Sequence, residues 1–379
     1  VEQYIDDVIR AATKDTHEGL QYMGLSRCDP REEYLVNIRR RSPLQQARKN
    51  PKKTIDMAPM DANMVKLFFR FNGEDLDPRY VYLPFVREAG SMTQNGSEFT
   101  VSPVIADRVI SIGTDSIFVR LYCDRITFKR NATTYVANGK RETVQMVHSI
   151  IHHHQSEDEK PAIKSATTCM AHYLFCKYGF TETFKRYAGF EPLVATYFDP
   201  NQFSEDEWVI CSTSNAVPRG KGRIFGDITK QQNIKIAVKR EHYTQLVRGL
   251  IAGFFYVADR FPSHVQIEHL DSTRQWMTMM GYILFAASNG VGRLVDKMNN
   301  HINSLDEYVD IITKGDLADI GIDVENIYDF FAYIVANFDE QLLGGANKVN
   351  SMYDKSLNVL YYVMFDLIKN IFKFNFQLI

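Results

Sequence analysis

The chain has 379 residues, of which 45% are hydrophobic and 24% are charged, and its formal net charge is −2 at pH 7. This length allows a large buried core and about two domains. The near-neutral charge excludes a globally basic binding domain, so any contact with a polyanion must come from local clusters or from a partner.

The cysteines favour a reducing compartment. There are five of them, scattered along the chain without a paired CxxC spacing, which suits free thiols better than a disulfide scaffold. No apolar run approaches the ~20 residues of a membrane helix. We therefore expect a soluble, intracellular protein with no membrane contact.

The first 60 residues are expected to form a helix and a basic connector. Apolar residues recur at helical spacing from Tyr4 to Ala12, which predicts an amphipathic helix rather than a signal peptide. The next segment is interrupted by Pro43 and Pro51 and is the most cationic part of the chain. Its basic residues are Arg39, Arg40, Arg41, Arg48, Lys49, Lys52 and Lys53.

Residues 64 to 130 show the period-two pattern of strands. Val65 and Leu67 alternate with polar neighbours, as Ile117 and Val119 do later. The dipeptide Asn95-Gly96 is typical of a tight hairpin turn. The sequence predicts several short antiparallel strands here.

The pattern then changes twice. From about Glu142 to Ala188 the spacing of Val144, Val147 and Ile151 predicts helices, with a helix stop at Gly179. Residues 191 to 240 return to loop and strand character and contain the basic turn PRGKGR, whose cations are Arg219, Lys221 and Arg223.

The remainder, from His242 onward, is expected to be largely helical. It contains four apolar segments: GLIAGFFYVADRF, WMTMMGYILFAAS, IYDFFAYIVANF and LNVLYYVMFDLIKNIF. The chain ends on Phe372, Phe374 and Phe376 alternating with polar residues. An exposed aromatic strand tends to aggregate, so we expect a partner or further chain to cover it.

Residues that commonly bind metals or act as nucleophiles form no diagnostic set. His148 and His152 stand four apart beside His153 and His154, but no HExxH motif is present, so a solvated turn is expected. The residues Cys169, His172 and Cys176 fit the buried stripe of a helix. No GxSxG elbow occurs. We predict no catalytic residue, no metal site and no cofactor bound by this chain.

One passage resembles multisubunit RNA polymerase β-type subunits. LPFVREAGSMTQNG followed by ADRVI is similar to a passage of that family in which a Pro, a Gly and an Asn-Gly pair precede an Arg-Val-Ile strand. The segment from Ser97 to Asp107 is longer here than in the family. The matching positions are Leu83, Pro84, Gly90, Asn95, Gly96, Arg108, Val109 and Ile110.

A second match lies in the last third. Asp339 and Glu340 precede Gly345, Asn347 and Lys348, as an acidic cluster precedes a Gly-Asn-Lys-Arg phrase in the family, with Val349 in place of the Arg. The order of the two matches resembles the N-terminal half of such a subunit, as in the split β subunits of large tailed phages.

The resemblance implies assembly rather than autonomous catalysis. In that family the Asp triad that binds catalytic Mg²⁺ is on the β′-type partner, and no DFDGD phrase occurs here. It implies a protrusion-like β region and a lobe-like helical region along the DNA cleft. The expected partners are the C-terminal half of β, β′-type subunits, DNA and RNA, in the cytoplasm of an infected bacterial cell, with packaging in the virion left open.

The fold class expected is α+β, with antiparallel β-rich and helical regions. The expected regions are 1–60 (helix and connector), 61–141 (β-rich), 142–240 (mainly helical) and 241–379 (helical). Two rival functions stay open: a virion structural or internal protein, and a stand-alone DNA-processing enzyme.

Nucleic-acid contacts are assigned to basic residues, although each cluster also fits an ordinary solvated loop. The candidates are Arg39, Arg40, Arg41, Arg48, Lys49, Lys52, Lys53, Arg108, Arg219, Lys221, Arg223 and Lys348.

Overall fold

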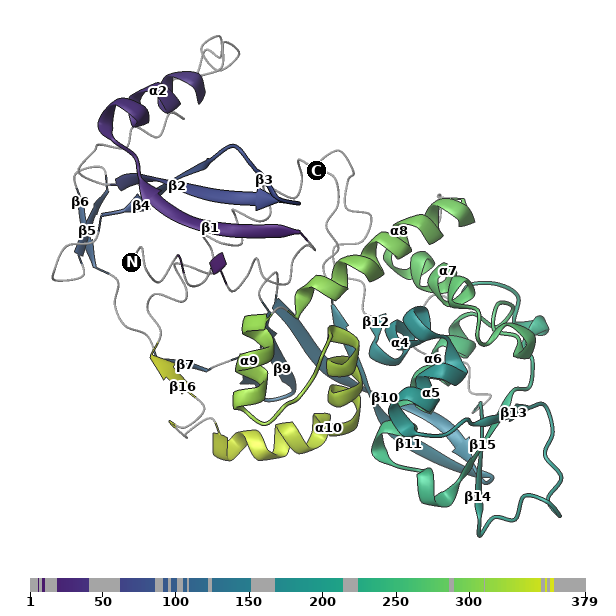
Figure 1. The fold of residues 1–379 in the computed structure, drawn as a ribbon. Helices are drawn as coiled ribbons and strands as arrows, with labels where there is room; N and C mark the ends of the chain where they lie inside the picture. The colour runs from purple at the N-terminus through teal and green to yellow at the C-terminus, as the bar shows by residue number, and fades with distance from the viewer. Residues whose placement is uncertain are drawn as a thin grey trace. The chain divides into compact units, whose positions relative to one another are not determined.

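The computed structural model of the chain divides into two units (Figure 1). Unit 1 comprises Val1–Ala106, Asp310–Ile312 and Lys355–Ile379, and unit 2 comprises Asp107–Val309 and Thr313–Asp354. The structure describes residues 6, 9–10, 19–40, 62–85, 91–94, 97–100, 105–107, 109–121, 125–150, 168–213, 224–285, 290–309, 311–348, 352 and 355–357.

Unit 1 is built on a four-stranded antiparallel sheet in which β2 is central. The alternation seen in the sequence buries Val65 and Leu67. A two-residue turn at Asn72 and Gly73, both with positive φ, joins β2 to β3. The elements are β1 (Leu20–Arg27), α2 (Pro30–Arg40), β2 (Ala62–Phe71), β3 (Glu74–Asp75) and β4 (Arg79–Pro84).

Two small ladders complete this unit. Residues 91–94 pair antiparallel with residues 97–100, so the hairpin predicted from Asn95-Gly96 is confirmed by the strands on either side of it. The other ladder joins strands that are distant in the sequence. The strands are β5 (Ser91–Gln94), β6 (Ser97–Thr100), β7 (Ile105–Asp107) and β16 (Lys355–Leu357).

Unit 2 contains an eight-stranded sheet with the path β12-β11-β10-β14-β15-β13, and β9 and β8 extend it beside β10. The long hairpin of β10 and β11 forms its middle (Figure 1). The strands are β8 (Ile110–Ile112), β9 (Ser116–Arg120), β10 (Arg125–Ala137), β11 (Lys140–Ile150), β12 (Thr168–Cys169), β13 (Leu193–Ala195), β14 (Trp208–Thr213) and β15 (Lys235–Lys239).

The helix predicted from residue 142 is wrong over residues 142–150, which form β11. Val144 and Val147 are both buried, and their spacing of three resembles a helical repeat. In a strand, residues three apart lie on opposite faces. The helical spacing therefore arises because this hairpin buries one face near its tip and the other face farther along.

Helices cover the sheet of unit 2 and supply most of its core. α6 packs across β10, β11 and β14, and α4 lies against α6, α7 and α10. α4 ends at Gly179, as predicted, where φ is +84°. The α-helices are α4 (Met170–Tyr178), α5 (Phe180–Ala188), α6 (Gln245–Arg260), α7 (Thr273–Leu284), α8 (Val291–Leu305), α9 (Ile311–Asp319) and α10 (Ile327–Lys348), and the 3₁₀ helices are η2 (Ile228–Lys230), η3 (Arg240–His242), η4 (Ile267–His269) and η5 (Asp306–Tyr308).

The fold is α+β, as the sequence predicts. Three of the four apolar segments contribute to α6, α7 and α10. The fourth begins at Leu357, the last residue of β16, and its remainder and the alternating C-terminus lie outside the described residues. The predicted N-terminal helix is described at residues 6 and 9–10, which are helical. In the part of the chain that the structure describes, no helix is long and apolar enough to span a membrane.

Candidate nucleic-acid surface

The basic residues singled out in the sequence fall largely outside the described part of the chain. Arg39 and Arg40 are the last two residues of α2, and Lys348 is the last residue of α10. The other candidates lie outside the described residues. They are Arg41, Arg48, Lys49, Lys52, Lys53, Arg108, Arg219, Lys221 and Arg223.

The metal-binding candidates are placed in two settings. His148 lies in β11, where burial lowers its pKa, so the solvated turn predicted there is wrong at this residue. Residues 152–154 lie outside the described residues. Cys169, His172 and Cys176 are buried at 2%, 1% and 0% exposure and belong to the core, as predicted. Among the described residues, no three His, Cys, Asp or Glu side chains gather as a metal ion would need.

Two aromatic pairs, one on α6 and one on α10, also belong to the core and cannot stack on bases. Phe254, Phe255, Phe330 and Phe331 are all at most 1% exposed. Phe330 and Phe331 pack edge-on against Phe128 of β10. These rings are therefore closed to a nucleic-acid base, and any stacking side chain must be sought elsewhere.

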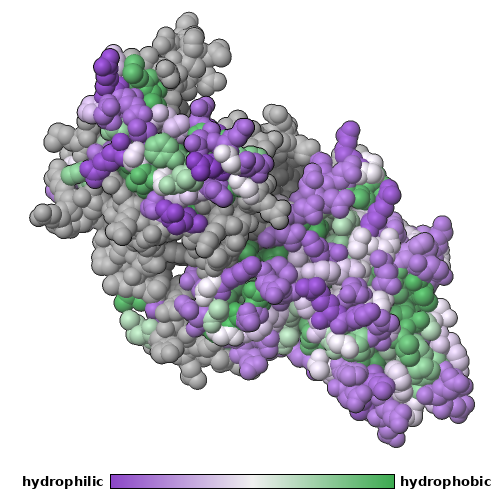
Figure 2. Space-filling model, in the orientation of Figure 1, coloured by the Kyte–Doolittle hydropathy of each residue, from purple (hydrophilic) through white to green (hydrophobic). Residues whose placement is uncertain are grey.

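The sheet of unit 2 has a second face whose lysines alternate with apolar residues in the sequence, but these lysines were not among the predicted nucleic-acid contacts. Along β15, Ile236 and Val238 are buried in the core at 0% and 1% exposure, so Lys235 and Lys239 extend from the opposite face. In the view of Figure 2 the surface at the lower right is largely hydrophilic, beside an apolar patch. The opposite face of β15 is therefore cationic.

A lateral row of side chains crosses five strands on this outer face. Pairing places Ala195 opposite Lys235, Lys235 opposite Ser212, Ser212 opposite Val136, and Val136 opposite Arg141. Directly paired residues share a face, so these five side chains lie on one face. We call them the outer row. It holds two cations and no carboxylate.

The spacing of the two cations in the outer row suits a nucleic-acid backbone. Lys235 and Arg141 are three strands apart, roughly 14 Å at the usual strand separation. Measured along the axis of a duplex, that distance spans about four nucleotide steps of one strand. Arg141 is exposed and Lys235 is half-buried, so both side chains are accessible to phosphates.

An exposed aromatic ring stands next to the outer row. Tyr197 is 67% exposed, and the Lys235 ammonium lies 5.8 Å from the centre of its ring. A cation over an aromatic face is attracted by the ring. Lys239, farther along β15, is instead 3.7 Å from the carboxylate of Glu241. Tyr197 and Lys235 thus form the part of this face best suited to a base and its phosphate.

The carboxylate closest in sequence to Arg141 is held on the other face. The Glu142 carboxylate accepts a hydrogen bond of 2.6 Å from the Tyr243 hydroxyl. It also forms an ion pair with the Arg248 guanidinium at 2.5 Å. Tyr243 also bonds to the Tyr135 hydroxyl at 2.5 Å. Burial is the largest cause that raises the pKa of both tyrosines, so both remain neutral donors. This network fastens the hairpin to α6 and keeps Glu142 away from the outer row.

The hairpin tip is fastened to β14 by one asparagine. Asn138 has a φ of +44°, and its side-chain amide donates to the Trp208 carbonyl at 3.0 Å. Its side-chain oxygen accepts from the Ile210 amide at 2.7 Å. These bonds fix the tip beside β14 and hold Arg141 in line with Lys235.

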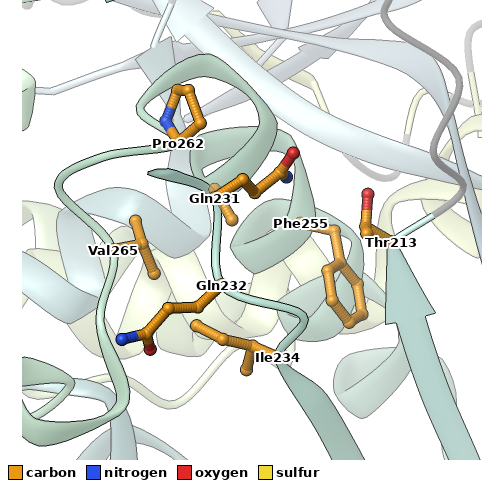
Figure 3. Close-up of a pocket in the computed structure, with 8 residues that line it drawn as sticks. Thr213, Gln231, Gln232, Ile234, Phe255, Pro262 and Val265 are labelled. Carbon is orange, nitrogen blue, oxygen red and sulfur yellow. The ribbon is translucent and has the colours of Figure 1, made fainter. Parts of the chain in front are cut away.

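A small cavity lies under the end of β14 (Figure 3). Its volume is about 10 Å³, which is room for one water molecule and not for a nucleotide. Beside it, Asp259 accepts hydrogen bonds from Thr213 (2.7 Å) and Gln231 (3.1 Å), while burial raises its pKa. These bonds hold the half-buried Asp259 carboxylate beside the cavity.

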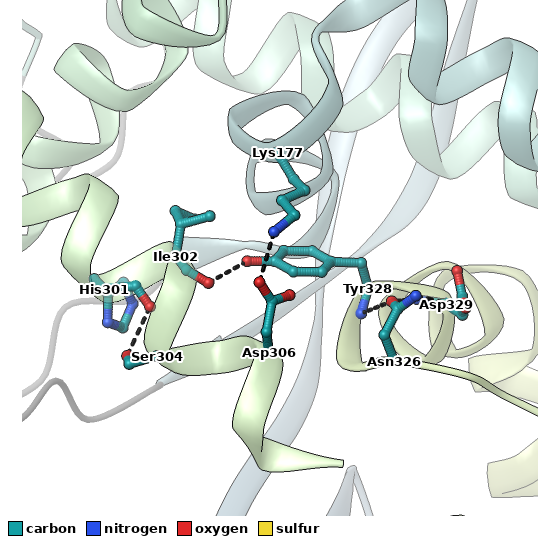
Figure 4. A network of polar contacts seen from close by, with 8 residues as sticks. All are labelled: Lys177, His301, Ile302, Ser304, Asp306, Asn326, Tyr328 and Asp329. Atoms are coloured by element: carbon teal, nitrogen blue, oxygen red, sulfur yellow. Dashed lines mark hydrogen bonds and ion pairs between the residues drawn. The ribbon is translucent and has the colours of Figure 1, made fainter. Parts of the chain in front are cut away.

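A polar network ties three helices of unit 2 together (Figure 4). Lys177 of α4 pairs with Asp306 at 2.7 Å, and the Tyr328 hydroxyl of α10 donates to the Ile302 carbonyl of α8 at 2.8 Å. Asn326 accepts from the Tyr328 amide at 2.9 Å and caps α10. These contacts position α10 against α4 and α8.

The family comparison covers the whole chain. A family model described as non-virion RNA polymerase subunit matches residues 1–379. No curated protein matches the chain.

Proposed function

Because the chain belongs to the family of non-virion RNA polymerase subunits, we propose that it is a β-type, non-catalytic subunit that holds nucleic acid on the outer face of its unit 2 sheet. Subunits of a polymerase act with the other polymerase subunits, which are therefore its partners. The observation that carries the proposal is the outer row, in which Lys235 and Arg141 share one face without a carboxylate between them.

The β-type assignment is supported by the two sequence matches described above. Leu83 and Val109, both at anchor positions, are buried at 3% and 4% exposure. Asp339 of the second match binds Arg130 at 2.8 Å. These residues contribute to the packing of the chain, as expected of a subunit that lines an active site formed by other subunits.

We assign the chemistry to a partner. Nucleotidyl transfer by two metal ions needs carboxylates placed to hold those ions. The sequence has no DFDGD phrase, and no group of three side chains among the described residues is placed to hold a metal ion. We expect the catalytic Mg²⁺ on a β′-type subunit. In this arrangement the present chain contributes charge and shape along the cleft during transcription.

The rival functions have less support. A non-virion polymerase subunit is expected to act in the infected cell, and the family gives no support to packaging in the virion or to a virion structural role. No observation favours a stand-alone DNA-processing enzyme over the polymerase family that matches the chain.

Charge reversal in the outer row tests the proposal. The polymerase assembled with Lys235→Glu and Arg141→Glu should bind a DNA template with lower affinity, and the slope of log K against log salt should fall by about two. Arg293→Glu, at an exposed position on α8, is the matched control. Equal affinity and slope for the outer-row variant, the control and the unmodified complex would overturn the proposal.

A further inference from the structure

A groove of about 620 Å³ runs along one side of α10 in unit 2. Its floor includes Ala332 and Ala336, which stand one helical turn apart on α10, and its walls include Tyr187 of α5 and Leu246 of α6. Small side chains on a helix allow another segment to approach closely. The two alanines therefore leave room for another segment along this side of α10.

The groove is acidic at the end where α10 begins. Asp323 and Glu325 are exposed in the loop that precedes the helix, and Asp329 lies on its first turns. Asp329 accepts hydrogen bonds from the Tyr187 hydroxyl and the Asn326 amide, both at 2.9 Å. These carboxylates face the space along which an incoming segment would lie.

One cation lines the groove, and it is already engaged. The Arg186 guanidinium lies 5.1 Å from the ring centre of Tyr178 and 5.6 Å from that of Tyr187. It is also 3.6 Å from a carboxylate oxygen of Asp329. With three carboxylates and one arginine among the lining residues, the groove carries a net negative charge.

We infer that this groove receives a segment of another polymerase subunit that carries Lys or Arg side chains beside small apolar ones. This inference rests on the proposed function only in that the chain works within an assembled polymerase. Charge decides the class of occupant: carboxylates repel phosphates, so nucleic acid is excluded, whereas a cationic segment is complementary to the acidic end. The apolar floor would cover its uncharged side chains.

Assembly measurements test the inference. The tagged full-length chain with Asp323→Lys and Glu325→Lys, produced with the other polymerase subunits, should co-purify about tenfold less of one of them. Asp296→Lys with Glu268→Lys reverses two exposed carboxylates outside the groove and should co-purify normal amounts. Unchanged co-purification of every subunit by the groove variant would overturn the inference, while the nucleic-acid binding of the outer row would be untouched.

Cross-linking identifies the occupant. A photoreactive phenylalanine at position 336, on the groove floor, should cross-link within the assembled polymerase to a peptide of another subunit with Lys or Arg near the site. A cross-link to a second copy of this chain or to nucleic acid would contradict the inference. So would the lack of any cross-link in a complex that has assembled fully.

Discussion

The ammonium of Lys235 lies 5.8 Å from the ring centre of Tyr197, a side chain that is 67% exposed. The ring is presented at the edge of the sheet rather than packed in the core, and the cation beside it belongs to the outer row. Together they offer a flat apolar surface and a positive charge to the same ligand, the combination found in single-stranded nucleic-acid sites.

Tyr197→Ala should weaken binding of single-stranded nucleic acid to the assembled polymerase. A base stacked on an aromatic ring contributes about 1–3 kcal/mol, so we expect a loss of roughly tenfold in affinity. Tyr197→Phe keeps the ring and should bind normally. Fluorescence anisotropy with a labelled oligonucleotide measures both, and an equal loss for Ala and Phe would rule out stacking as the reason.

Asn138→Ala should destabilise unit 2 by about 2 kcal/mol, because the substitution removes two hydrogen bonds to β14. It also leaves alanine, which is poorly suited to positive φ, at a position where φ is positive. Asn138→Gly suits the backbone and should lose only about 1 kcal/mol. The chain's two tryptophans, Trp208 and Trp276, both lie in unit 2, so their fluorescence during urea unfolding reports this unit. Similar losses for Ala and Gly would contradict the backbone part of this account.

Gly253→Ala tests the crossing of α6 and α4. A Cβ at Gly253 would stand 2.5 Å from the Cβ of Ala171 and 2.8 Å from the sulfur of Cys169. We expect this overpacking to outweigh the gain in helix propensity and to cost about 1–2 kcal/mol. Gly292→Ala on α8, where no atom lies within 4 Å, should instead stabilise by up to about 1 kcal/mol. Thermal unfolding of both variants checks the opposite signs.

His172 should make unit 2 sensitive to acid. Burial lowers its pKa from 6.5 to about 3, so the folded chain keeps the ring neutral while the unfolded chain protonates it below pH 6.5. The neutral His172 ring therefore causes no loss of stability above pH 6.5, and the free energy of unfolding falls as pH drops below that value. The decrease is about 2 kcal/mol at pH 5. His172→Gln, which offers a donor to the Trp276 carbonyl that His172 contacts at 3.0 Å, should reduce the difference in unfolding free energy between pH 7 and pH 5 by that amount.

The control for this pH effect is His269→Gln, at an exposed position. His148 and His264, whose pKa values burial also lowers, remain in both variants and cancel in the comparison. If the pH dependence of His172→Gln matched that of the control, the buried neutral ring would not be the source of the acid sensitivity.

Local patterns predicted the elements in which one face or one stripe is buried throughout. Val65 and Leu67 in β2, and Phe254 and Phe330 in their helices, lie in the core as their periodicity indicates. The failure at β11 has a physical cause. The partner strand β10 buries Phe128 on one face of the sheet and Tyr135 on the other, because residues an odd number apart in a strand point to opposite faces. The buried face therefore changes along the hairpin, and neither strand shows a continuous period of two.

The candidate surface was beyond prediction from sequence because it depends on sheet order. Arg141 and Lys235 are far apart along the chain, and only the insertion of β14 between β10 and β15 aligns them. Arg141 follows a single lysine and Lys235 stands between two isoleucines, whereas the basic clusters predicted to bind nucleic acid lie mostly outside the described residues. Tyr197 carried no signal either, since a single tyrosine in a loop indicates nothing by itself.

The most direct test of the account is a reconstruction of the assembled non-virion RNA polymerase on a DNA template with nascent RNA. We predict that a nucleic-acid backbone lies along the outer row, within reach of Lys235 and Arg141, and that another subunit supplies the carboxylates that bind the catalytic Mg²⁺. An outer row turned away from the nucleic acid, or catalytic carboxylates supplied by this chain, would contradict it.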